Sequence, residues 1–223
     1  GEFVSRSGSA GDLYRVMNFG LKRIPGRLAV ATVAGNAVFA AVTGTSLASA
    51  AAFSRLAYPE MIAAGYSRKY ALGSVAGSAC LGMLIPPSVL LIIWGIVTEI
   101  SIGFLFLAGI LPGILLSLLM AFYCTGFAIA RPNLAPAVDL SDERLTGQEV
   151  VSGLGVIFLI LAVLGSIWAG FATPSEAAAL GALFGLVLAL IKGVRWDGIR
   201  EAIVDSGKVI APILFLLLTA QMY

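Results

Sequence analysis

The sequence contains no histidine, few charged residues and only two cysteines. The lack of histidine excludes imidazole from any metal site, proton relay or catalytic triad. Only 12% of the residues are charged, whereas a soluble domain carries about 25%, so this chain cannot cover a surface that faces water. Cys80 and Cys124 lie inside apolar runs, and we interpret them as buried small hydrophobic residues rather than a disulfide or a metal pair.

Apolar sequence is what the chain has in abundance. Hydrophobic residues make up 59% of its 223 residues, and its mean hydropathy is +0.99. We therefore predict an all-α, polytopic membrane protein. The first residue is not Met, and the last apolar run, from Val209 to Tyr223, is shorter than the roughly 20 residues that a span needs. We expect an internal piece of a longer membrane protein.

The N-terminal residues 1–27 are expected to hold the end of a span and an amphipathic arm. In residues 10–27 the apolar positions recur at spacings of three and four and alternate with basic residues such as Arg15 and Lys22. This pattern predicts a helix that lies in the membrane interface, with a solvated loop helix as the alternative. The pair Pro25-Gly26 ends it.

Residues 28–56 form an apolar run with Gly44 near its centre, which fits either one crossing or a re-entrant hairpin. Basic residues flank both ends of the run, and Lys and Arg near span ends favour the cytoplasm. A hairpin that enters and leaves on one side keeps both clusters inside. Each limb is also too short to span the bilayer at about 1.5 Å per residue. We therefore predict a re-entrant hairpin.

Hydropathy and charge organise the remaining residues. We predict a cytoplasmic connection and a broken transmembrane helix at 57–98, a transmembrane helix at 102–130, a cytoplasmic loop at 131–149, two transmembrane helices of a second repeat at 150–191, and a cytoplasmic helix with a truncated span at 192–223. This topology places every Lys and Arg on one side of the membrane, with only Glu99 and Glu176 on the other. The distribution agrees with the excess of basic residues in cytoplasmic loops.

A stretch of small residues occupies the centre of the predicted hairpin, Thr43-Gly44-Thr45-Ser46-Leu47-Ala48-Ser49. Gly44 permits a tight reversal or a positive φ, and the hydroxyl groups supply oxygen atoms that suit a hard cation such as sodium. Helix ends that face this tip would favour an anionic group through exposed N–H groups and the helix dipole. Close helix packing explains small residues equally well, so both interpretations stay open here.

The span that follows is interrupted at Leu81–Ser88 by the pair Pro86-Pro87. Two prolines remove two donors and end a helix before them, which leaves carbonyl groups from Gly82 to Ile85 without helical partners. A true discontinuity is favoured over a proline kink that neighbouring helices satisfy. A pair of interruptions of this kind is what a transporter uses to hold an ion and a solute near the middle of the bilayer.

Two further polar features lie in the apolar runs. Asn36 places a buried amide in the first limb, where we expect it to orient the tip or to bond across to Ser78 or Ser88. A plain helix–helix hydrogen bond is favoured over direct contact between Asn36 and a bound ligand. Thr173-Pro174-Ser175-Glu176 predicts the start of a helix, with Thr173 as its cap and Glu176 at its positive end.

These motifs resemble the large membrane subunit of the tripartite ATP-independent periplasmic (TRAP) transporters, DctM type, over essentially the whole chain. Each motif is weak alone, but their order and spacing together are specific. The motifs are Ser5-Arg6-Ser7-Gly8, Arg23-Ile24-Pro25-Gly26, Thr43-Gly44-Thr45-Ser46, Tyr58-Pro59-Glu60-Met61, Gly82-Met83-Leu84-Ile85-Pro86-Pro87-Ser88, Ser101-Ile102-Gly103, Leu107-Ala108-Gly109-Ile110-Leu111-Pro112-Gly113 and Ala172-Thr173-Pro174-Ser175-Glu176-Ala177-Ala178.

The resemblance implies a multi-pass secondary carrier of the bacterial inner membrane, with an elevator-type mobile domain inside a scaffold. This chain would be the first half of the inverted repeat, and it ends before the second hairpin, so alone it should not transport. The implied partners are a small four-helix membrane subunit, a periplasmic solute-binding protein that delivers an organic acid such as a C4-dicarboxylate, and the lipid bilayer. Sodium would be the coupling ion, without a cofactor, and no nucleic-acid partner is expected.

Site residues follow from the same motifs. Sodium would bind at Thr45, Ser46, Gly82, Ile85 and Pro87. The substrate would face Thr43, Thr45, Ser49 and Ser88. Supporting roles would fall to Asn36, Gly44 and Pro86. The tip reads Thr-Gly-Thr-Ser where the family more usually has Ser-Gly-Ser-Ser, which keeps the hydroxyl groups, and residues 10–27 would be the first arm helix.

Three other functions were weighed against this one. An inverted-repeat anion and sodium symporter without a binding protein shares the broad architecture, but the long arm and the Ala-Thr-Pro-Ser-Glu-Ala turn favour a TRAP permease. An intramembrane enzyme would need a nucleophile with a base or a metal motif, and the chain has no histidine and no acidic residue deep in a span. A non-transporting scaffold would not need a broken helix opposite a hydroxyl-rich hairpin.

Overall fold

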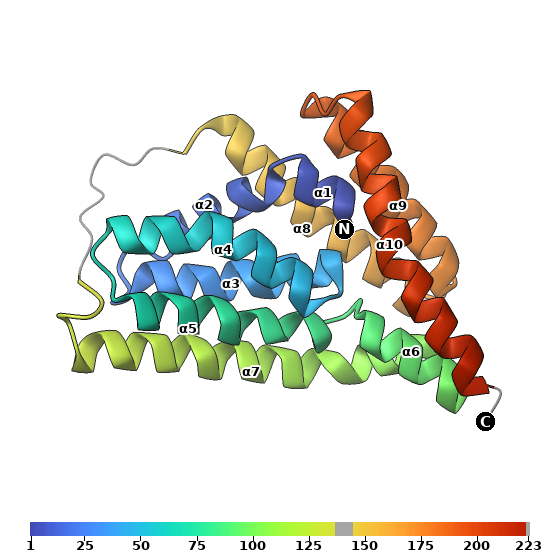
Figure 1. Ribbon diagram of the computed structural model, residues 1–223, viewed down its shortest axis with the longest axis horizontal. Helices are drawn as coiled ribbons and strands as arrows, with labels where there is room; N and C mark the ends of the chain where they lie inside the picture. The colour runs from blue at the N-terminus through green and yellow to red at the C-terminus, as the bar shows by residue number, and fades with distance from the viewer. Residues whose placement is uncertain (137–144, 222–223) are drawn as a thin grey trace.

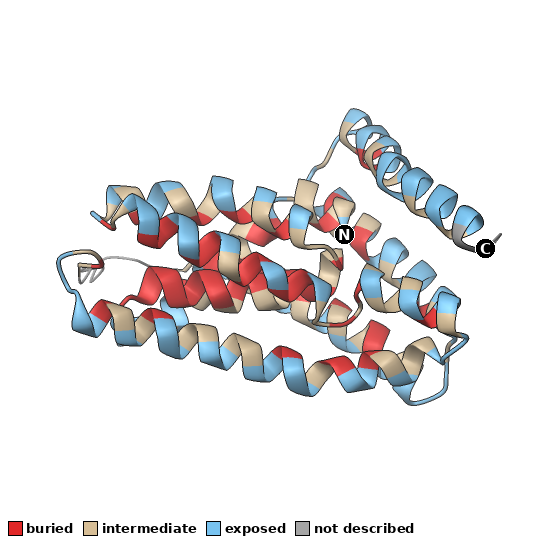
Figure 2. Ribbon diagram, turned by 60° about the horizontal axis from the view of Figure 1, so that its bottom comes forward, coloured by how far each residue is buried: buried red, intermediate tan, exposed pale blue. Residues whose placement is uncertain are grey.

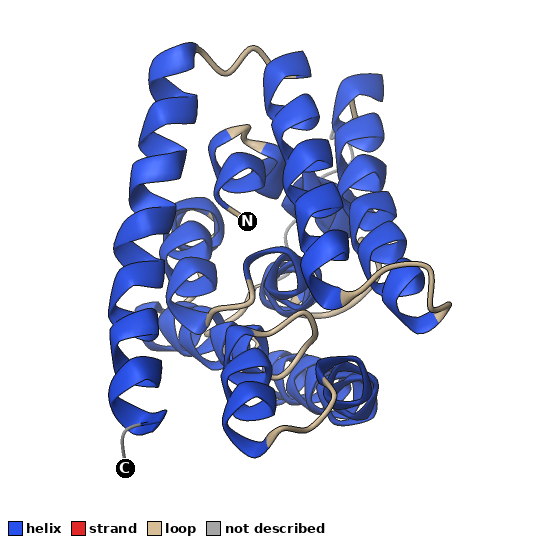
Figure 3. Cartoon of the chain, turned by 90° about the vertical axis from the view of Figure 1, so that its right-hand side faces the viewer, coloured by secondary structure: helices blue, strands red, loops and turns tan. Residues whose placement is uncertain are grey.

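The computed structural model describes residues 1–136 and 145–221, and every regular element within them is a helix (Figures 1 and 3). Four of these helices are long and apolar enough to cross a membrane. They are α7 (Ile102–Ala130), α8 (Gly147–Trp168), α9 (Pro174–Ile191) and α10 (Trp196–Gln221). The protein is therefore an all-α, polytopic membrane protein. Asp139, Asp142, Glu143 and Arg144 of the predicted loop lie outside the described residues.

Two short helices open the chain, α1 (Glu2–Arg6) and α2 (Ser9–Gly20). Helix α2 covers only the first part of the predicted arm, because it ends at Gly20, and the prediction that Pro25-Gly26 ends this helix was wrong. Its face with Leu13 and Tyr14 is buried against α3 and α8. Two ion pairs also fasten it, from Asp12 to Lys192 and from Arg15 to Glu149. Its apolar face is thus covered by protein, and its position relative to a membrane stays a prediction.

The predicted hairpin is a pair of helices side by side, α3 (Arg27–Thr43) and α4 (Ser46–Ala63), joined at Gly44 and Thr45 (Figure 1). Helix α3 is the most deeply enclosed element and forms the centre of the core (Figure 2). It contacts α2, α4, α5, α7 and α8. Whether the hairpin is re-entrant in a bilayer stays a prediction.

The second limb is longer than the sequence predicts, because α4 continues through Pro59 to Ala63. Pro59 has no N–H to donate to the carbonyl of Arg55 and normally disturbs a helix interior. Ala57 and Met61, on either side of it, are fully buried, so tertiary packing holds the helix together. The predicted connection from residue 57 was wrong at this end, and the actual link to the next helix is residues 64–67.

The predicted break in the next span is confirmed as a helix discontinuity. Helix α5 (Arg68–Ala79) passes into the 3₁₀ turn η1 (Cys80–Met83), and helix α6 starts only at Val89 and ends at Thr98. Cys80 is exposed at this turn, so the prediction that both cysteines are buried was wrong for Cys80 and is confirmed for Cys124. Helix α7 then runs back along α6, α5 and α3 (Figure 1). The capping prediction for α9 is also confirmed, since Thr173 and Glu176 form a reciprocal capping box.

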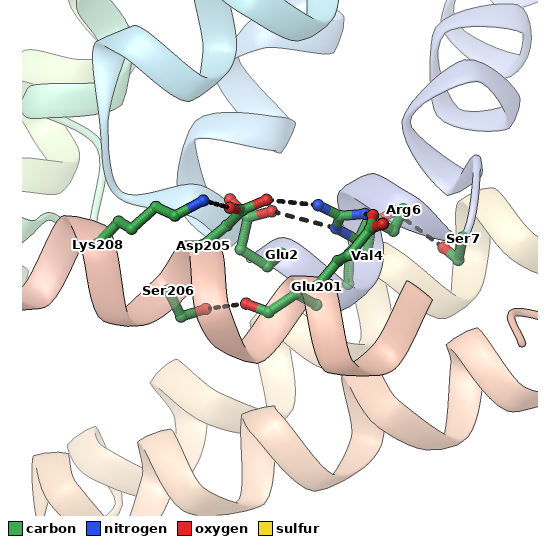
Figure 4. Close-up of polar contacts among 9 residues, drawn as sticks. Glu2, Val4, Arg6, Ser7, Glu201, Asp205, Ser206 and Lys208 are labelled. Carbon is green, nitrogen blue, oxygen red and sulfur yellow. Dashed lines mark hydrogen bonds and ion pairs between the residues drawn. The ribbon is translucent and has the colours of Figure 1, made fainter. Parts of the chain in front are cut away.

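Helix α10 differs from the prediction of a separate cytoplasmic helix and a later span. It is one continuous helix that contains Pro212. Its polar half finds partners on α1, where the Arg6 guanidinium donates to Glu201 at 2.6 Å and also pairs with Asp205 (Figure 4). These hydrogen bonds raise the pKa of Arg6, with Glu201 the largest contributor. The polar residues of this segment, which the prediction placed in a separate cytoplasmic helix, belong to the same continuous helix as the apolar residues that follow them.

Candidate ion and substrate site

The hairpin tip touches the helix break through backbone atoms. The N–H of Val89, the first residue of α6, donates to the carbonyl oxygen of Gly44 at 3.0 Å. Gly44 has a φ of 67°, in the left-handed region that favours glycine. A Cβ at this position would lie 2.8 Å from the carbonyl oxygen of Pro87. Only a glycine lets the tip approach the break this closely.

A second glycine makes the same contact from the other side. A Cβ at Gly82 would lie 2.6 Å from the carbonyl oxygen of Thr45 and 2.9 Å from the nitrogen of Ser46. The peptide group that starts α4 therefore rests directly on η1. Two interruptions that are 37 residues apart in the sequence, at Thr45 and Gly82, form one backbone junction in the fold.

The break leaves several acceptors open. The N–H groups of Leu84 and Ile85 both donate to the carbonyl of Leu81, and Pro86 and Pro87 have no N–H. Among residues 1–136 and 145–221, no backbone N–H donates to the carbonyl oxygens of residues 84–87. These oxygens, together with the Thr45 and Ser46 hydroxyls, are the kind of ligand set that discontinuous transporter helices offer to sodium.

Two helix N-termini meet at the same junction. Helix α4 begins at Ser46, with Thr45 as its N-cap and the Thr45 hydroxyl accepting from the N–H of Ala48 at 3.4 Å. Helix α6 begins at Val89 with Ser88 as its N-cap. The N-terminal end of a helix carries unpaired N–H groups and a partial positive charge, which favour an anionic group. The junction thus offers oxygen ligands to a cation beside N–H donors to an anion.

The predicted substrate hydroxyls divide into buried and accessible groups. Ser49 and Ser88 are fully buried, and the Ser88 hydroxyl donates to the carbonyl of Met83 at 2.6 Å. The Thr43 hydroxyl donates to the carbonyl of Phe39 at 3.1 Å and lies 3.5 Å from the Ser49 hydroxyl. Thr43, Thr45 and Ser46 are half-buried. Thr43 and Thr45 are therefore the accessible members of the predicted substrate set, and Ser46, a predicted sodium ligand, is exposed to a similar degree. Leu47 is the most exposed residue of the tip, at 80%.

Asn36, the predicted supporting residue, forms a hydrogen bond inside the core. Its amide Nδ2 donates to the Ser78 hydroxyl at 2.6 Å, and that hydroxyl donates to the carbonyl of Ser74 at 2.6 Å. Of the two partners considered from sequence, Ser78 is the one in contact. The bond joins α3 to α5 inside the core, and Asn36 is fully buried. Asn36 lies eight residues before Gly44, about 12 Å along the helix, so its predicted supporting role at the tip stays a prediction.

A cavity of about 420 Å³ lies beside the tip, between the hairpin, α6 and α10. Its walls include Thr43, Thr45 and Val89, and from outside the predicted set Glu2 and Ser206. Gly109 of α7 was also missed, although a Cβ there would lie 2.9 Å from the carbonyl oxygen of Leu84. No local pattern marks Glu2 or Ser206, since only the fold brings them to the tip, whereas Gly109 lies within one of the quoted motifs.

Comparisons with known proteins identify relatives over the whole chain. A family model described as "Tripartite ATP-independent periplasmic transporter, DctM component" matches residues 1–223. The C4-dicarboxylate TRAP transporter large permease protein DctM of Pseudomonas aeruginosa is 32% identical over 228 residues, covering 100% of this chain and 52% of that protein. The ectoine TRAP transporter large permease protein TeaC of Halomonas elongata is 32% identical, covering 97% of this chain and 50% of that protein.

A third relative has another substrate in its name. The 2,3-diketo-L-gulonate TRAP transporter large permease protein YiaN of Escherichia coli is 28% identical over 218 residues, covering 93% of this chain and 49% of that protein. The chain thus spans about half the length of the curated relatives it matches.

Proposed function

This chain belongs to the DctM family of tripartite ATP-independent periplasmic transporters, and we propose that it supplies one half of the transport site of a sodium-coupled permease for an organic acid. The observation that supports this proposal is the backbone junction between the hairpin tip and the broken helix. It sets open carbonyl oxygens and tip hydroxyls against two helix N-termini, within an apolar protein. The family and the relatives are described as transporters, so we propose that the protein moves its ligands unchanged.

Sodium binds, in this proposal, on the break side of the junction. Its ligands are the Thr45 and Ser46 hydroxyls and backbone carbonyls between Gly82 and Pro87, because unwound carbonyls and helix C-terminal ends coordinate sodium in discontinuous membrane helices. The Gly82–Thr45 contact keeps these two ligand groups side by side. A shift of the tip would therefore weaken sodium binding before it affected the rest of the fold.

The organic acid binds on the tip side, where its anionic group meets the N-termini of α4 and α6. Thr43 and Thr45 face the adjacent cavity and supply hydroxyl partners. C4-dicarboxylate and 2,3-diketo-L-gulonate, which appear in the names of two relatives, are organic anions of this kind. The named substrates differ between relatives, so we propose the class and not one compound.

The proposed assembly is that of a TRAP transporter in the bacterial inner membrane, with a small four-helix membrane subunit and a periplasmic solute-binding protein. Helix α7 carries a broad exposed apolar surface, including Leu111 at 77% and Phe122 at 71% exposed. Surfaces of this size need cover from lipid or from another membrane subunit. The exposed face of α7 is compatible with either.

Transport in liposomes tests the proposal. The intact permease that contains this chain is reconstituted with its small subunit, and a binding protein loaded with a labelled organic acid is added outside. Uptake is measured with and without an inward sodium gradient for wild type, Ser46→Ala and Ser54→Ala. Ser54 is a matched control, since it lies on the same helix, is exposed and bonds only within α4.

We expect sodium-dependent uptake in the wild type, a raised sodium requirement in Ser46→Ala and unchanged behaviour in Ser54→Ala. Uptake that does not respond to sodium would contradict the coupling. Equal sodium requirements in wild type and Ser46→Ala would contradict the site while leaving the transporter function standing.

A further inference from the structure

A long groove lies between α5 and α7, away from the tip. It encloses about 720 Å³, and Val33 of α3 forms part of its floor. The α7 wall is mostly apolar, with Leu119, Met120 and Phe127. Leu119 remains 56% exposed, so the groove is open along its side. The wall formed by α7 and the adjoining Arg131 extends from residue 119 to 131, about 18 Å, close to the roughly 15 Å depth of one leaflet's hydrocarbon.

One end of the groove is strongly basic. Arg68 and Lys69 form the first turn of α5, and Arg131 directly follows α7. Cations are unfavourable in the first turn of a helix, which is its positive end, so this placement calls for a compensating anion. Within the described part of the chain none of the three forms an ion pair. Arg131 lies over the Phe127 ring, 5.5 Å from its centroid, at the point where basic and apolar surfaces meet.

We propose that this groove is a binding site for an anionic phospholipid. The phosphate headgroup lies among Arg68, Lys69 and Arg131, and an acyl chain lies along the apolar wall of α7. A free phosphate would use only the basic end, whereas the apolar length of the groove requires a hydrocarbon tail. Basic pockets between transmembrane helices on the cytoplasmic side bind acidic headgroups, and the charge distribution predicts the cytoplasmic side for these three residues.

A bound lipid here would join helices α5 and α7. Ser67, at the start of α5, donates its N–H to the carbonyl of Leu134 beyond α7 at 2.8 Å. Tyr70 donates its hydroxyl hydrogen to the carbonyl of Cys124 at 2.7 Å. The groove lies over these two contacts, so a lipid within it would hold the same helices together from outside.

The charge test uses the intact protein, purified in detergent, stripped of lipid and titrated with phosphatidylglycerol or phosphatidylethanolamine while bound lipid is counted by native mass spectrometry. The variant Arg68→Gln/Lys69→Gln/Arg131→Gln removes the basic end. Its control is Arg55→Gln/Arg195→Gln/Arg200→Gln, which removes the same charge from exposed positions outside the groove. Each basic residue near an acidic headgroup contributes about fivefold to affinity, so the groove variant should bind phosphatidylglycerol roughly a hundredfold more weakly.

A steric test leaves every charge in place. Gly73 lines the groove, and a Cβ there would meet no atom within 4 Å, so Gly73→Leu fills the groove without disturbing the core. Gly126→Leu is the matched control, because Gly126 on α7 is equally open and does not line the groove.

The proposal expects tight phosphatidylglycerol binding that both groove variants weaken and both controls retain, with phosphatidylethanolamine bound more weakly throughout. Equal binding by groove variants and controls would overturn it. So would displacement of the signal by inorganic phosphate at matched concentration, because that result would identify a phosphate site without a lipid tail.

Discussion

The contact between Gly82 and the hairpin tip yields a sharp prediction. In Gly82→Ala the new methyl carbon would lie 2.6 Å from the Thr45 carbonyl oxygen, 2.7 Å from its carbonyl carbon and 2.9 Å from the Ser46 nitrogen. A relaxed carbon–oxygen contact is about 3.3 Å or longer, so the tip must move by roughly 0.7 Å. All three neighbours are backbone atoms, and no side chain can rotate away to relieve the clash.

Two consequences follow from this displacement. Overpacking of a well-packed interior costs about 1–3 kcal/mol, so we expect Gly82→Ala to lower the free energy of unfolding by that amount. A displacement approaching 1 Å in a preorganised site can cost on the order of a hundredfold in function. Sodium-dependent uptake should therefore fall much further than stability does, with the sodium requirement raised.

Liposome uptake at varied sodium, together with thermal unfolding in detergent, measures both effects. Gly73→Ala is the control, because it adds the same methyl group to the same broken helix at a position with no atom within 4 Å. Alanine is also favoured over glycine there, by up to about 1 kcal/mol. A Gly82→Ala protein with the sodium requirement and melting temperature of the control would refute the tip–break junction as the ion site.

Three further variants test the junction and its supports. Gly44→Ala should lower the melting temperature more than Gly170→Ala does. Both glycines have a positive φ, but only at Gly44 would a Cβ meet a backbone atom, 2.8 Å away. Equal shifts in melting temperature would show that only the cost of the positive φ matters. Asn36→Leu leaves the buried Ser78 hydroxyl without its donor and should lower the free energy of unfolding by about 1–3 kcal/mol. An unchanged melting temperature would contradict this expectation. Arg6→Gln removes two ion pairs to α10, an exposed one to Glu201 and a part-buried one to Asp205. Surface pairs are worth about 0.2–1 kcal/mol each, and the deficit should shrink in high salt. A salt-independent deficit would indicate lost packing instead.

The sequence predicts local features of the chain better than it predicts which distant residues contact each other. The helix break, the glycine at the tip and the capped start of α9 follow from glycine, proline and hydroxyl residues whose effects are local. The sequence left Ser78 and Ser88 open as partners of Asn36. In the fold Asn36 bonds to Ser78, and both residues are fully buried. The continuation of α4 through Pro59 was missed, because full burial of Ala57 and Met61 outweighs the lost hydrogen bond.

The junction itself could not be predicted from local rules, and only the family resemblance placed Thr45 and Gly82 in one site. Its contacts join backbone atoms that are 37 residues apart, Thr45 and Gly82, and no periodicity encodes such a distance. The same holds for the place of Ser206 beside the tip, because it depends on how α10 crosses the hairpin. Helix α10 was itself divided in the prediction, since its polar half resembles a water-exposed segment until Arg6 is seen to pair with it.

The contacts also indicate where an elevator-type movement would have to bend the chain. Asn36–Ser78 and Gly82–Thr45 join the hairpin to the broken helix as one unit, while ion pairs fasten α2 to α8 and α9. One link between the two groups along the chain is residues 21–26, which end at Gly26 with a φ of 70°. We therefore expect a movement of the hairpin unit to bend the chain there and to loosen the packing of α2 on α3.

Spin labels can test this movement in the intact protein. The exposed residues Ser54 on α4 and Gln148 on α8 belong to the two groups, and a second pair, Ser54 with Gly73 on α5, lies within the hairpin unit. In a background with Cys80→Ser and Cys124→Ala, sodium and substrate should change the distance distribution between Ser54→Cys and Gln148→Cys. The distance between Ser54→Cys and Gly73→Cys should stay constant, because the buried contacts hold that unit together. A constant first distance under conditions that support uptake would rule out the bend, and a change in both would show that the hairpin and broken helix do not move as one body.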